Sequence, residues 1–194
     1  MTKIYDKEED LPEILKGKTL IAIGPGLGKS NLSRELFYFF MKSDLPKIID
    51  ADALNLLSES QEKYDLKNAV LTPHPKEAAR LLKRTVAKIQ QDRKKSVQDL
   101  FNKYQAISIL KGCNSLIFTG YQKFYLCPYG NPAMAVAGMG DILTGLIAGF
   151  ATQNISLGES AILATYQHAL AADKIKSKKG EIGLLPMDIL TNYY

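Results

Sequence analysis

Short apolar runs alternate along this chain with stretches of helical periodicity, and this alternation leaves few folds open. We expect buried strands at residues 19–23, 48–50, 69–71 and 106–110, followed by a hairpin of residues 115–119 and 123–126 around Gly120. Helical spacing predicts helices at residues 32–42, 53–57, 86–104, 141–153 and 159–176. This alternation is typical of a largely parallel sheet covered by helices on both faces. We therefore predict one α/β domain over residues 1–194.

Polar or glycine-rich motifs follow each of the first four predicted strands. They occupy residues 24–28, 50–55, 72–77 and 111–115. Ligands in open α/β sheets bind at the carboxyl ends of the strands, which lie at one edge. The sequence therefore predicts a binding site at that edge.

A further motif lies at residues 131–145, where small residues and glycines lead into an apolar helix. Gly138 and Gly140 let a phosphate approach the backbone, and the first N–H groups of the helix point at it. Asp141 is placed to take a proton while those N–H groups hold developing negative charge. The alternative is a tight turn in which Asp141 only caps the helix.

The glycine loop at 24–28 has neither dinucleotide-binding nor P-loop spacing, so it predicts neither a Rossmann cofactor nor a Walker ATPase. The alternative to a ligand-binding loop is a structural turn.

Asp50 and Asp52 form a carboxylate pair suited to a divalent cation or a substrate hydroxyl. The alternative is that Asp52 caps the helix that follows it.

Two further side chains are candidates for ligand contacts. His74 is bracketed by prolines and rigidly presented, although a lone histidine is usually structural. Lys111 at a strand end is placed to meet a nucleotide phosphate, with a solvated lysine as the alternative. His168 lies in an apolar helix and is predicted to pack in the core. The lysine-rich stretches at 83–103 and 174–179 are predicted to be solvated.

Composition excludes several classes of protein. The 194 residues carry a formal charge of +5, too mild for the dense basic stripe of a nucleic-acid binder. No apolar run approaches membrane-spanning length and no signal-peptide core opens the chain, so we expect a cytoplasmic protein without a membrane partner. Two cysteines, Cys113 and Cys127, suit a reducing compartment and form no metal-type pair.

Five segments together resemble the ADP/ATP-dependent NAD(P)H-hydrate dehydratases, a branch of the ribokinase-like fold. They are residues 23–28, 50–55, 71–77, 110–112 and 131–145, in the family's order, and the similarity runs from about Thr19 to Leu190. The resemblance implies that ADP or ATP phosphorylates the ring hydroxyl of hydrated NADH or NADPH. Phosphate then leaves and the double bond is restored, because phosphorylation converts a poor leaving group into a good one.

The resemblance also implies roles for single residues. Asp141 is implied to be the base that activates the hydroxyl, beside the anion hole formed by Gly138 and Gly140. Implied nucleotide contacts are Lys111, Gly112, Cys113, Asn114, Ser115, Gly138 and Gly140. Implied contacts to the hydrated dinucleotide are Gly26, Gly28, His74, Asn131 and Asp141. Mg²⁺ is expected without an assigned protein ligand, as is a homo-oligomer, commonly a tetramer, with an epimerase domain or subunit as a candidate partner.

The chain departs from the family in two places. Met139 stands where the family commonly has threonine, with a modest expected effect because the backbone N–H remains. The lead segment 1–18 matches poorly, and the family's first strand–helix units are missing, which predicts a fragment or a site completed by another subunit. A small-molecule kinase of the same fold, acting on a vitamin-precursor alcohol, is one alternative, and a nucleotide-binding remnant without catalysis is another. The segments 72–75 and 50–55 favour the dehydratase.

Overall fold

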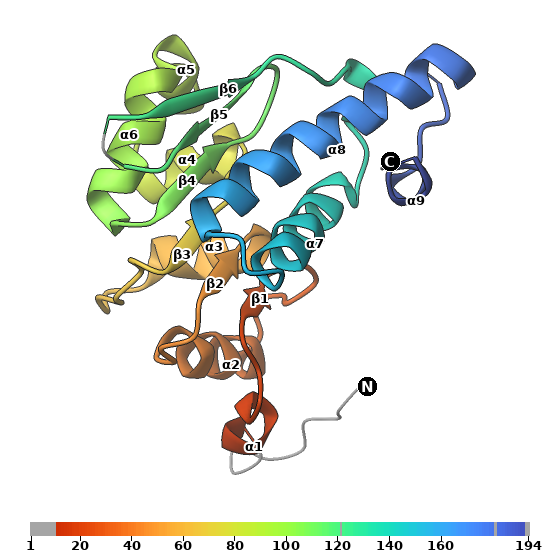
Figure 1. Ribbon diagram of the computed structural model, residues 1–194. Coiled ribbons are helices and arrows are strands. Elements are labelled where there is room, and N and C mark those ends of the chain that lie inside the picture. The colour runs from red at the N-terminus through yellow and green to blue at the C-terminus, as the bar shows by residue number, and fades with distance from the viewer. Residues whose placement is uncertain (1–10, 121, 181, 193–194) are drawn as a thin grey trace.

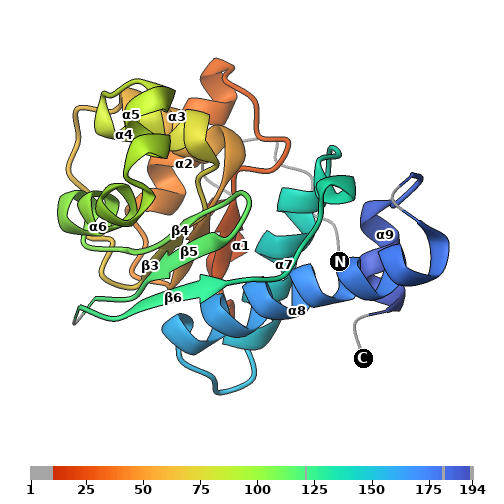
Figure 2. The same ribbon diagram turned by 90° about the horizontal axis from the view of Figure 1, so that it is seen from above.

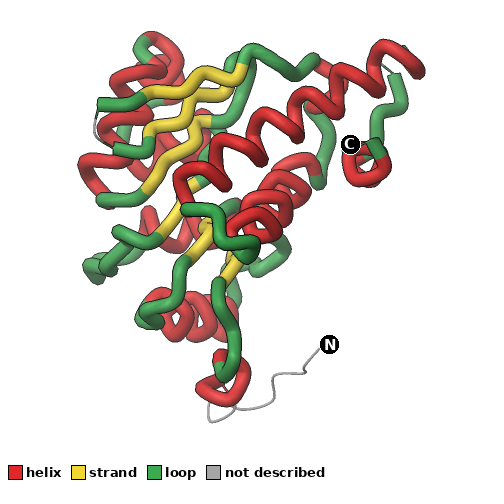
Figure 3. The backbone as a smooth tube through the Cα atoms, viewed as in Figure 1, coloured by secondary structure: helices red, strands yellow, loops and turns green. Residues whose placement is uncertain are grey.

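A mixed six-stranded sheet forms the centre of the computed structural model, which describes residues 11–120, 122–180 and 182–192. The strands follow the order β1 to β6 across the sheet: β1 (Ile21–Ile23), β2 (Lys47–Ile49), β3 (Ala69–Leu71), β4 (Ile107–Leu110), β5 (Ser115–Phe118) and β6 (Phe124–Cys127). The first four are parallel, whereas β5 is antiparallel to both of its neighbours. Figure 3 shows these strands between helices. The predicted strands, the hairpin and the α/β class are confirmed.

Two helical layers cover the sheet (Figures 1 and 2). One face carries α2 (Asn31–Met41), α3 (Ala51–Glu59), α4 (Pro75–Leu82), α5 (Val86–Gln91) and α6 (Arg93–Tyr104). The other face carries α7 (Met139–Ala151) and α8 (Leu157–Lys179), with α9 (Pro186–Thr191) against their far ends. The short elements α1 (Leu11–Leu15) and η2 (Pro132–Met134) complete the described chain. Of the lead segment expected at residues 1–18, residues 1–10 lie outside the described part.

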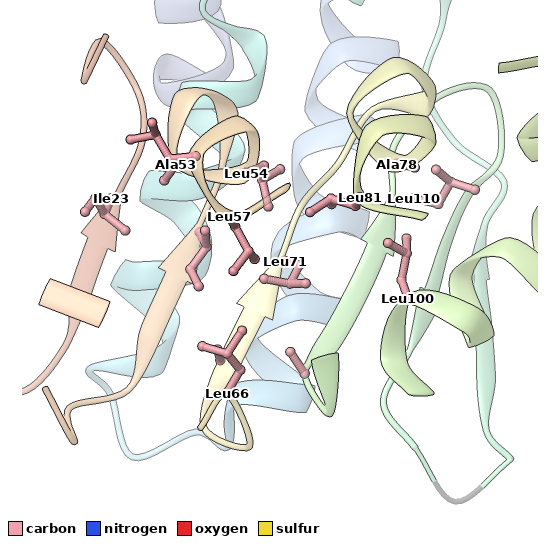
Figure 4. Close-up of a cluster of buried hydrophobic side chains, with 14 of the residues drawn as sticks. Ile23, Ala53, Leu54, Leu57, Leu66, Leu71, Ala78, Leu81, Leu100 and Leu110 are labelled. Carbon is pink, nitrogen blue, oxygen red and sulfur yellow. The ribbon is translucent and has the colours of Figure 1, made fainter. Parts of the chain in front are cut away.

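The strand pleat divides the apolar side chains between two cores. Alternate residues of a strand face opposite sides of the sheet, so neighbouring residues join different clusters. Ile49, Leu71 and Leu110 belong to the cluster under α2 to α6, part of which is drawn in Figure 4. The set Ile48, Val70, Ile109 and Ile117 packs instead against α7 and α8. The central strands are buried on both faces, which explains why they read as continuous apolar runs.

The helix predicted over 86–104 is wrong in detail, because the segment forms two helices. The chain turns at Asp92, whose carboxylate accepts a hydrogen bond from the Lys95 N–H and caps α6. Competition of this short polar side chain for backbone N–H groups favours a new helix start over continuation. The sequence pattern also gave no prediction of α4, α1 and α9, each of which is shorter than nine residues.

Candidate active site

The carboxyl ends of β1 to β4 lie at one edge of the sheet, as predicted, and backbone hydrogen bonds join the loops that leave them. The N–H of Asp50 donates to the carbonyl of Ile23, and the N–H of Lys111 donates to the carbonyl of Pro73. The motifs that follow these four strands are therefore neighbours in space.

A buried ion pair lies at the centre of this edge. The Lys111 ammonium donates to Oδ1 of Asp50 at 2.7 Å, and the Thr144 hydroxyl of α7 donates to Oδ2 at 2.9 Å. Asp50 is 1% exposed and the Lys111 side chain is 18% exposed. The solvated interpretation of Lys111 is therefore wrong, since the lysine is held between β2, β4 and α7.

The carboxylate pair predicted for Asp50 and Asp52 is divided by the structure. Asp50 turns toward α7, whereas the carboxylate of Asp52 accepts the Gly28 N–H at 2.9 Å. The interpretation of Asp52 as a helix cap is wrong, because it lies in the first turn of α3 and holds the glycine loop. Within residues 11–120, 122–180 and 182–192, no group of three or more His, Cys, Asp or Glu side chains is arranged to hold a metal ion.

The amino end of α7 lies directly beside the ion pair. Gly138 takes a φ of 89° as its N-cap, a left-handed conformation that favours glycine. A Cβ built on Gly140 would lie 3.2 Å from the Lys111 Nζ and 3.4 Å from Oδ2 of Asp50. Among the described residues, the backbone N–H groups of Gly140 and Asp141 meet no acceptor. This turn therefore presents free donors and one cation to an anion.

Asp141 lies in the first turn of α7 with an exposed side chain. Its carboxylate accepts no hydrogen bond from the described part of the chain, so it caps nothing. The structure thus separates the two carboxylates of this region by role. Asp50 is buried and paired, while Asp141 remains available to a proton donor outside the chain.

Met139, the departure from the family pattern, is 5% exposed. It packs in a cluster with Ala172, Ile175 and Ile189, and the Gly138 backbone abuts Pro186. The side chain in the glycine turn therefore anchors the start of α7 to α8 and α9.

His74 is the N-cap of α4. Its Nδ1 accepts hydrogen bonds from the N–H groups of Lys76 and Glu77, and the Glu77 carboxylate accepts the His74 N–H at 2.8 Å. Burial and, next, the Lys111 and Arg80 charges lower the pKa of His74. The ring is therefore neutral at neutral pH, with a structural role for Nδ1 and a half-exposed side chain.

The glycine loop is held open at the same edge. A Cβ on Gly26 would meet nothing within 4 Å, whereas the N–H of Gly28 is already bound by Asp52. Of the two predicted dinucleotide contacts in this loop, Gly26 has open space beside it, and Gly28 is fixed in position by Asp52 of α3.

The predicted nucleotide loop is braced by Arg93, a residue that the sequence analysis placed in a solvated stretch. Its guanidinium donates to the carbonyl of Leu110 at 3.1 Å and to those of Lys111 and Asn114 at 3.5 Å. The remaining loop residues are Gly112, which packs on Arg93, exposed Cys113, and Ser115, whose hydroxyl donates to the Gly112 carbonyl. The sequence signal for this role is an arginine among lysines at a helix start, because a guanidinium can donate hydrogen bonds to several carbonyls at once.

Asn131 faces α8. Its side-chain amide donates to Asp173 at 2.8 Å, and its oxygen accepts the Ala133 N–H. The structure therefore gives this predicted dinucleotide contact a structural role in the turn before α7.

His168, predicted to be a core residue, is 6% exposed and its Nε2 has no partner among the described residues. Burial and, next, the Lys111 charge lower the pKa of His168 to about 4, against 6.5 for the unperturbed ring. The unfolded chain thus binds a proton that the folded chain rejects between these values. The contribution of His168 to the free energy of unfolding is fully present above pH 6.5 and is lost as the pH falls toward 4.

We therefore expect His168→Gln to reduce the acid sensitivity of folding. Urea unfolding at pH 7.5 and 4.5 should give a difference between the two pH values that is smaller in the variant by about 3 kcal/mol. Parallel stability curves for wild type and variant would contradict this assignment.

Two surface hollows lie elsewhere. One, of about 420 Å³, is lined by residues of α6 and the β5–β6 hairpin, and the other, of about 450 Å³, by residues around the start of α8. Neither hollow is lined by Asp50, Lys111, Gly140 or Asp141. No helix in the described part of the chain is long and apolar enough to cross a membrane.

Comparison with known proteins identifies the family. The family model described as NAD(P)H-hydrate dehydratase matches residues 1–193. A bifunctional NAD(P)H-hydrate repair enzyme, Nnr, of Coxiella burnetii is 45% identical over 93% of this chain and 37% of its own length. The ADP-dependent (S)-NAD(P)H-hydrate dehydratase of Neisseria meningitidis is 37% identical over 88% of this chain and 59% of its length. This chain thus spans between about a third and three fifths of these relatives.

Solved structures agree on the fold. The ADP/ATP-dependent NAD(P)H-hydrate dehydratase of Bacillus subtilis, co-crystallised with ATP/Mg²⁺, superposes with a TM-score of 0.81 and 28% identity, over 90% of this chain and 62% of that one. A hydroxyethylthiazole kinase of Pyrococcus horikoshii, 17% identical, shares the fold with a TM-score of 0.75 over 97% of this chain and 76% of that one. The sheet is therefore ribokinase-like, and the chain belongs to the NAD(P)H-hydrate dehydratase family.

Proposed function

We propose that this chain catalyses the ADP- or ATP-dependent dehydration of hydrated NADH or NADPH. The observation that carries the proposal is the start of α7, whose first turn holds free N–H groups and the exposed carboxylate of Asp141 and packs at Gly140 against the Lys111 ammonium. Such a site suits phosphoryl transfer to a hydroxyl, which needs anion stabilisation beside a proton acceptor. The names of the family and of the Neisseria relative support the substrate.

In the first step, Asp141 takes the proton of the ring hydroxyl while that oxygen bonds to the terminal phosphorus of ADP or ATP. The bond from this phosphorus to the bridging oxygen breaks, and AMP or ADP leaves. The N–H groups of Gly140 and Asp141, with Lys111, hold the charge on the transferred group. In the second step the carbon–oxygen bond breaks and phosphate leaves with the electron pair. The neighbouring carbon gives its proton to water or to the departing phosphate, and the electrons of that carbon–hydrogen bond restore the double bond.

Mg²⁺ fits this site as a cation carried by the nucleotide rather than by a protein cage. Both oxygens of Asp50 already accept hydrogen bonds, and Asp52 is engaged by Gly28. Nucleotide phosphate oxygens and water would hold the ion, as is usual for Mg²⁺. When bound, it neutralises phosphate charge.

The proposal is tested with hydrated NADH and ADP, by following absorbance at the reduced-nicotinamide band. We expect the absorbance to return only when ADP or ATP is present. A folded chain that restores no absorbance, yet phosphorylates a hydroxyethylthiazole-type alcohol, would favour the kinase alternative, which the shared fold with the Pyrococcus enzyme supports.

We further propose that the chain works as a homo-oligomer, with a tetramer expected, and beside an epimerase domain or subunit. The bifunctional names of relatives such as the Coxiella protein support the second activity. Light scattering coupled to size-exclusion chromatography tests the assembly.

We expect His74→Ala to raise the KM for the hydrated dinucleotide by roughly tenfold, because a lost hydrogen bond to a bound ligand costs about 1.5 kcal/mol. The same change should lower the free energy of unfolding by about 1 kcal/mol through loss of the α4 cap. His74→Asn keeps a capping oxygen and separates the two effects: it should raise KM while stability stays near that of wild type. An unchanged KM in both variants would remove His74 from the substrate site.

A further inference from the structure

The buried carboxylate of Asp50 has two hydrogen-bond partners, Lys111 and Thr144, and both lie near the first turn of α7. Lys111 comes from the end of β4, and Thr144 lies one turn into α7, four residues after Gly140. Asp50 itself follows β2 as the N-cap of α3 and is 1% exposed. One side chain thus ties two strand ends to the helix whose first turn presents the free N–H groups.

Gly140 packs closely against Lys111 and Asp50. A Cβ at this position would already be closer than ordinary van der Waals contact to the Lys111 ammonium, at 3.2 Å. The glycine backbone therefore rests against the ammonium, with Asp50 behind it. Asp50 is hydrogen-bonded both to this lysine and, through Thr144, to the helix that carries the free N–H groups.

Stability does not account for this pair. Burying two charges costs hydration free energy, and their mutual attraction often does not recover that cost. Apolar residues of similar size therefore often give the same or greater folding stability. The titratable groups that face Lys111 are Asp50 at the start of α3, His74 and Glu77 at the start of α4, and His168 in α8. Both histidine pKa values are lowered, so neither ring adds positive charge at neutral pH, and Asp50 is the hydrogen-bonded counter-ion.

We propose that Asp50 is a positioning residue of the nucleotide site, which holds the Lys111 ammonium against the first turn of α7 so that both bind one phosphate. Asp50 does not touch the phosphate; it acts through Lys111 and Gly140. The inference rests on the proposed function in one respect, that the anion is the terminal phosphate of ADP or ATP.

The first test is Asp50→Asn, measured by calorimetry with ADP. Asparagine keeps the size of the side chain and an oxygen for Thr144, but it leaves the Lys111 ammonium without its counter-ion. A buried unpaired charge is costly, so the lysine turns to solvent and its place beside Gly140 is lost. We expect ADP to bind at least tenfold more weakly, with a matching rise in the KM for ADP.

The decisive test is the same change in a Lys111→Met background. With Lys111 absent, Asp50 is an unpaired anion next to the phosphate and repels it. Adding Asp50→Asn should now strengthen ADP binding by threefold or more, the opposite sign from its effect in the wild type. A residue that merely supported the fold would weaken binding in both backgrounds.

Glu59→Gln is the matched control, since it removes a carboxylate of α3 that pairs with Lys29 and Arg34 at the surface. It should leave ADP affinity within twofold. Circular dichroism verifies that each variant is folded. Should a single variant not fold, the double variant is compared with the wild type, and tenfold weaker ADP binding is expected because the cation is gone.

The inference is overturned if folded Asp50→Asn binds ADP within twofold of the wild type, if its effect keeps one sign in both backgrounds, or if the double variant binds as the wild type does. A wild-type chain that binds no ADP would overturn the inference together with nucleotide dependence. ADP binding without dehydration of hydrated NADH would instead contradict the proposed function alone.

Discussion

Asp141→Asn should lower the turnover of hydrated NADH by about 10³-fold, because general base catalysis supplies an acceleration of that order. Asparagine keeps the shape of the side chain but has no basic oxygen to take the hydroxyl proton. The affinity for ADP should stay within about threefold, since the N–H groups of the α7 turn and the Lys111–Asp50 pair are left in place. Single-turnover kinetics and calorimetry separate the two quantities.

Asp99→Asn is a suitable control for this experiment. Asp99 of α6 pairs with Arg84 and Lys95 and, within the described part of the chain, makes no hydrogen bond or ion pair with a residue of the candidate site, so its loss should leave turnover within twofold. If the affinity for ADP falls together with turnover in Asp141→Asn, the carboxylate has a structural role and the proposed base is wrong.

Gly24→Ala should prevent stable folding, with a loss of more than about 4 kcal/mol in the free energy of unfolding. A Cβ at this position would lie 1.8 Å from the carbonyl oxygen of Asp50, and no rotation of a side chain can relieve this clash because the oxygen belongs to the backbone and the Cβ is fixed to it. The φ of 127° adds strain for any residue but glycine. Urea unfolding and the yield of folded chain measure the effect.

Gly17→Ala serves as the matched comparison. Gly17 also has a positive φ, of 69°, but a Cβ there would meet nothing within 4 Å. Only the left-handed backbone penalises alanine at this position, so a cost of about 1 kcal/mol is expected. Similar costs for the two variants would mean that the contact between β1 and β2 gives way more easily than the structure indicates.

The fold was largely predictable from the sequence because the sheet has a regular chemical pattern. The central strands are short, apolar and buried on both faces, and a polar or glycine-rich motif follows each of them. The helix break at Asp92 was not predictable from periodicity, because α5 and α6 carry apolar residues at compatible spacing. What divides them is one capping hydrogen bond, between Asp92 and Lys95.

The candidate site was predicted as a set of loops but not as a set of contacts. The sequence placed Lys111 at the correct edge, since parallel strand order brings the strand ends together, and it singled out Gly140 and Asp141 at a helix start. It could not predict that Asp50 turns toward α7 while Asp52 turns toward Gly28, because both are carboxylates at nearly the same point of the chain. Arg93 was missed for a similar reason, since only the folded loop gathers three carbonyls around it.

The burial of Met139 against α9 has a consequence for the order in which the chain folds. Every other described element precedes α9 in the chain, yet Ile189 and Pro186 support the turn that holds Gly138 and Met139. During synthesis the sheet and its helices can assemble first, but the turn at Gly138 and Met139 gains its support only when α9 has left the ribosome. Nascent chains short of that point would be folded in the sheet and still unable to retain a nucleotide.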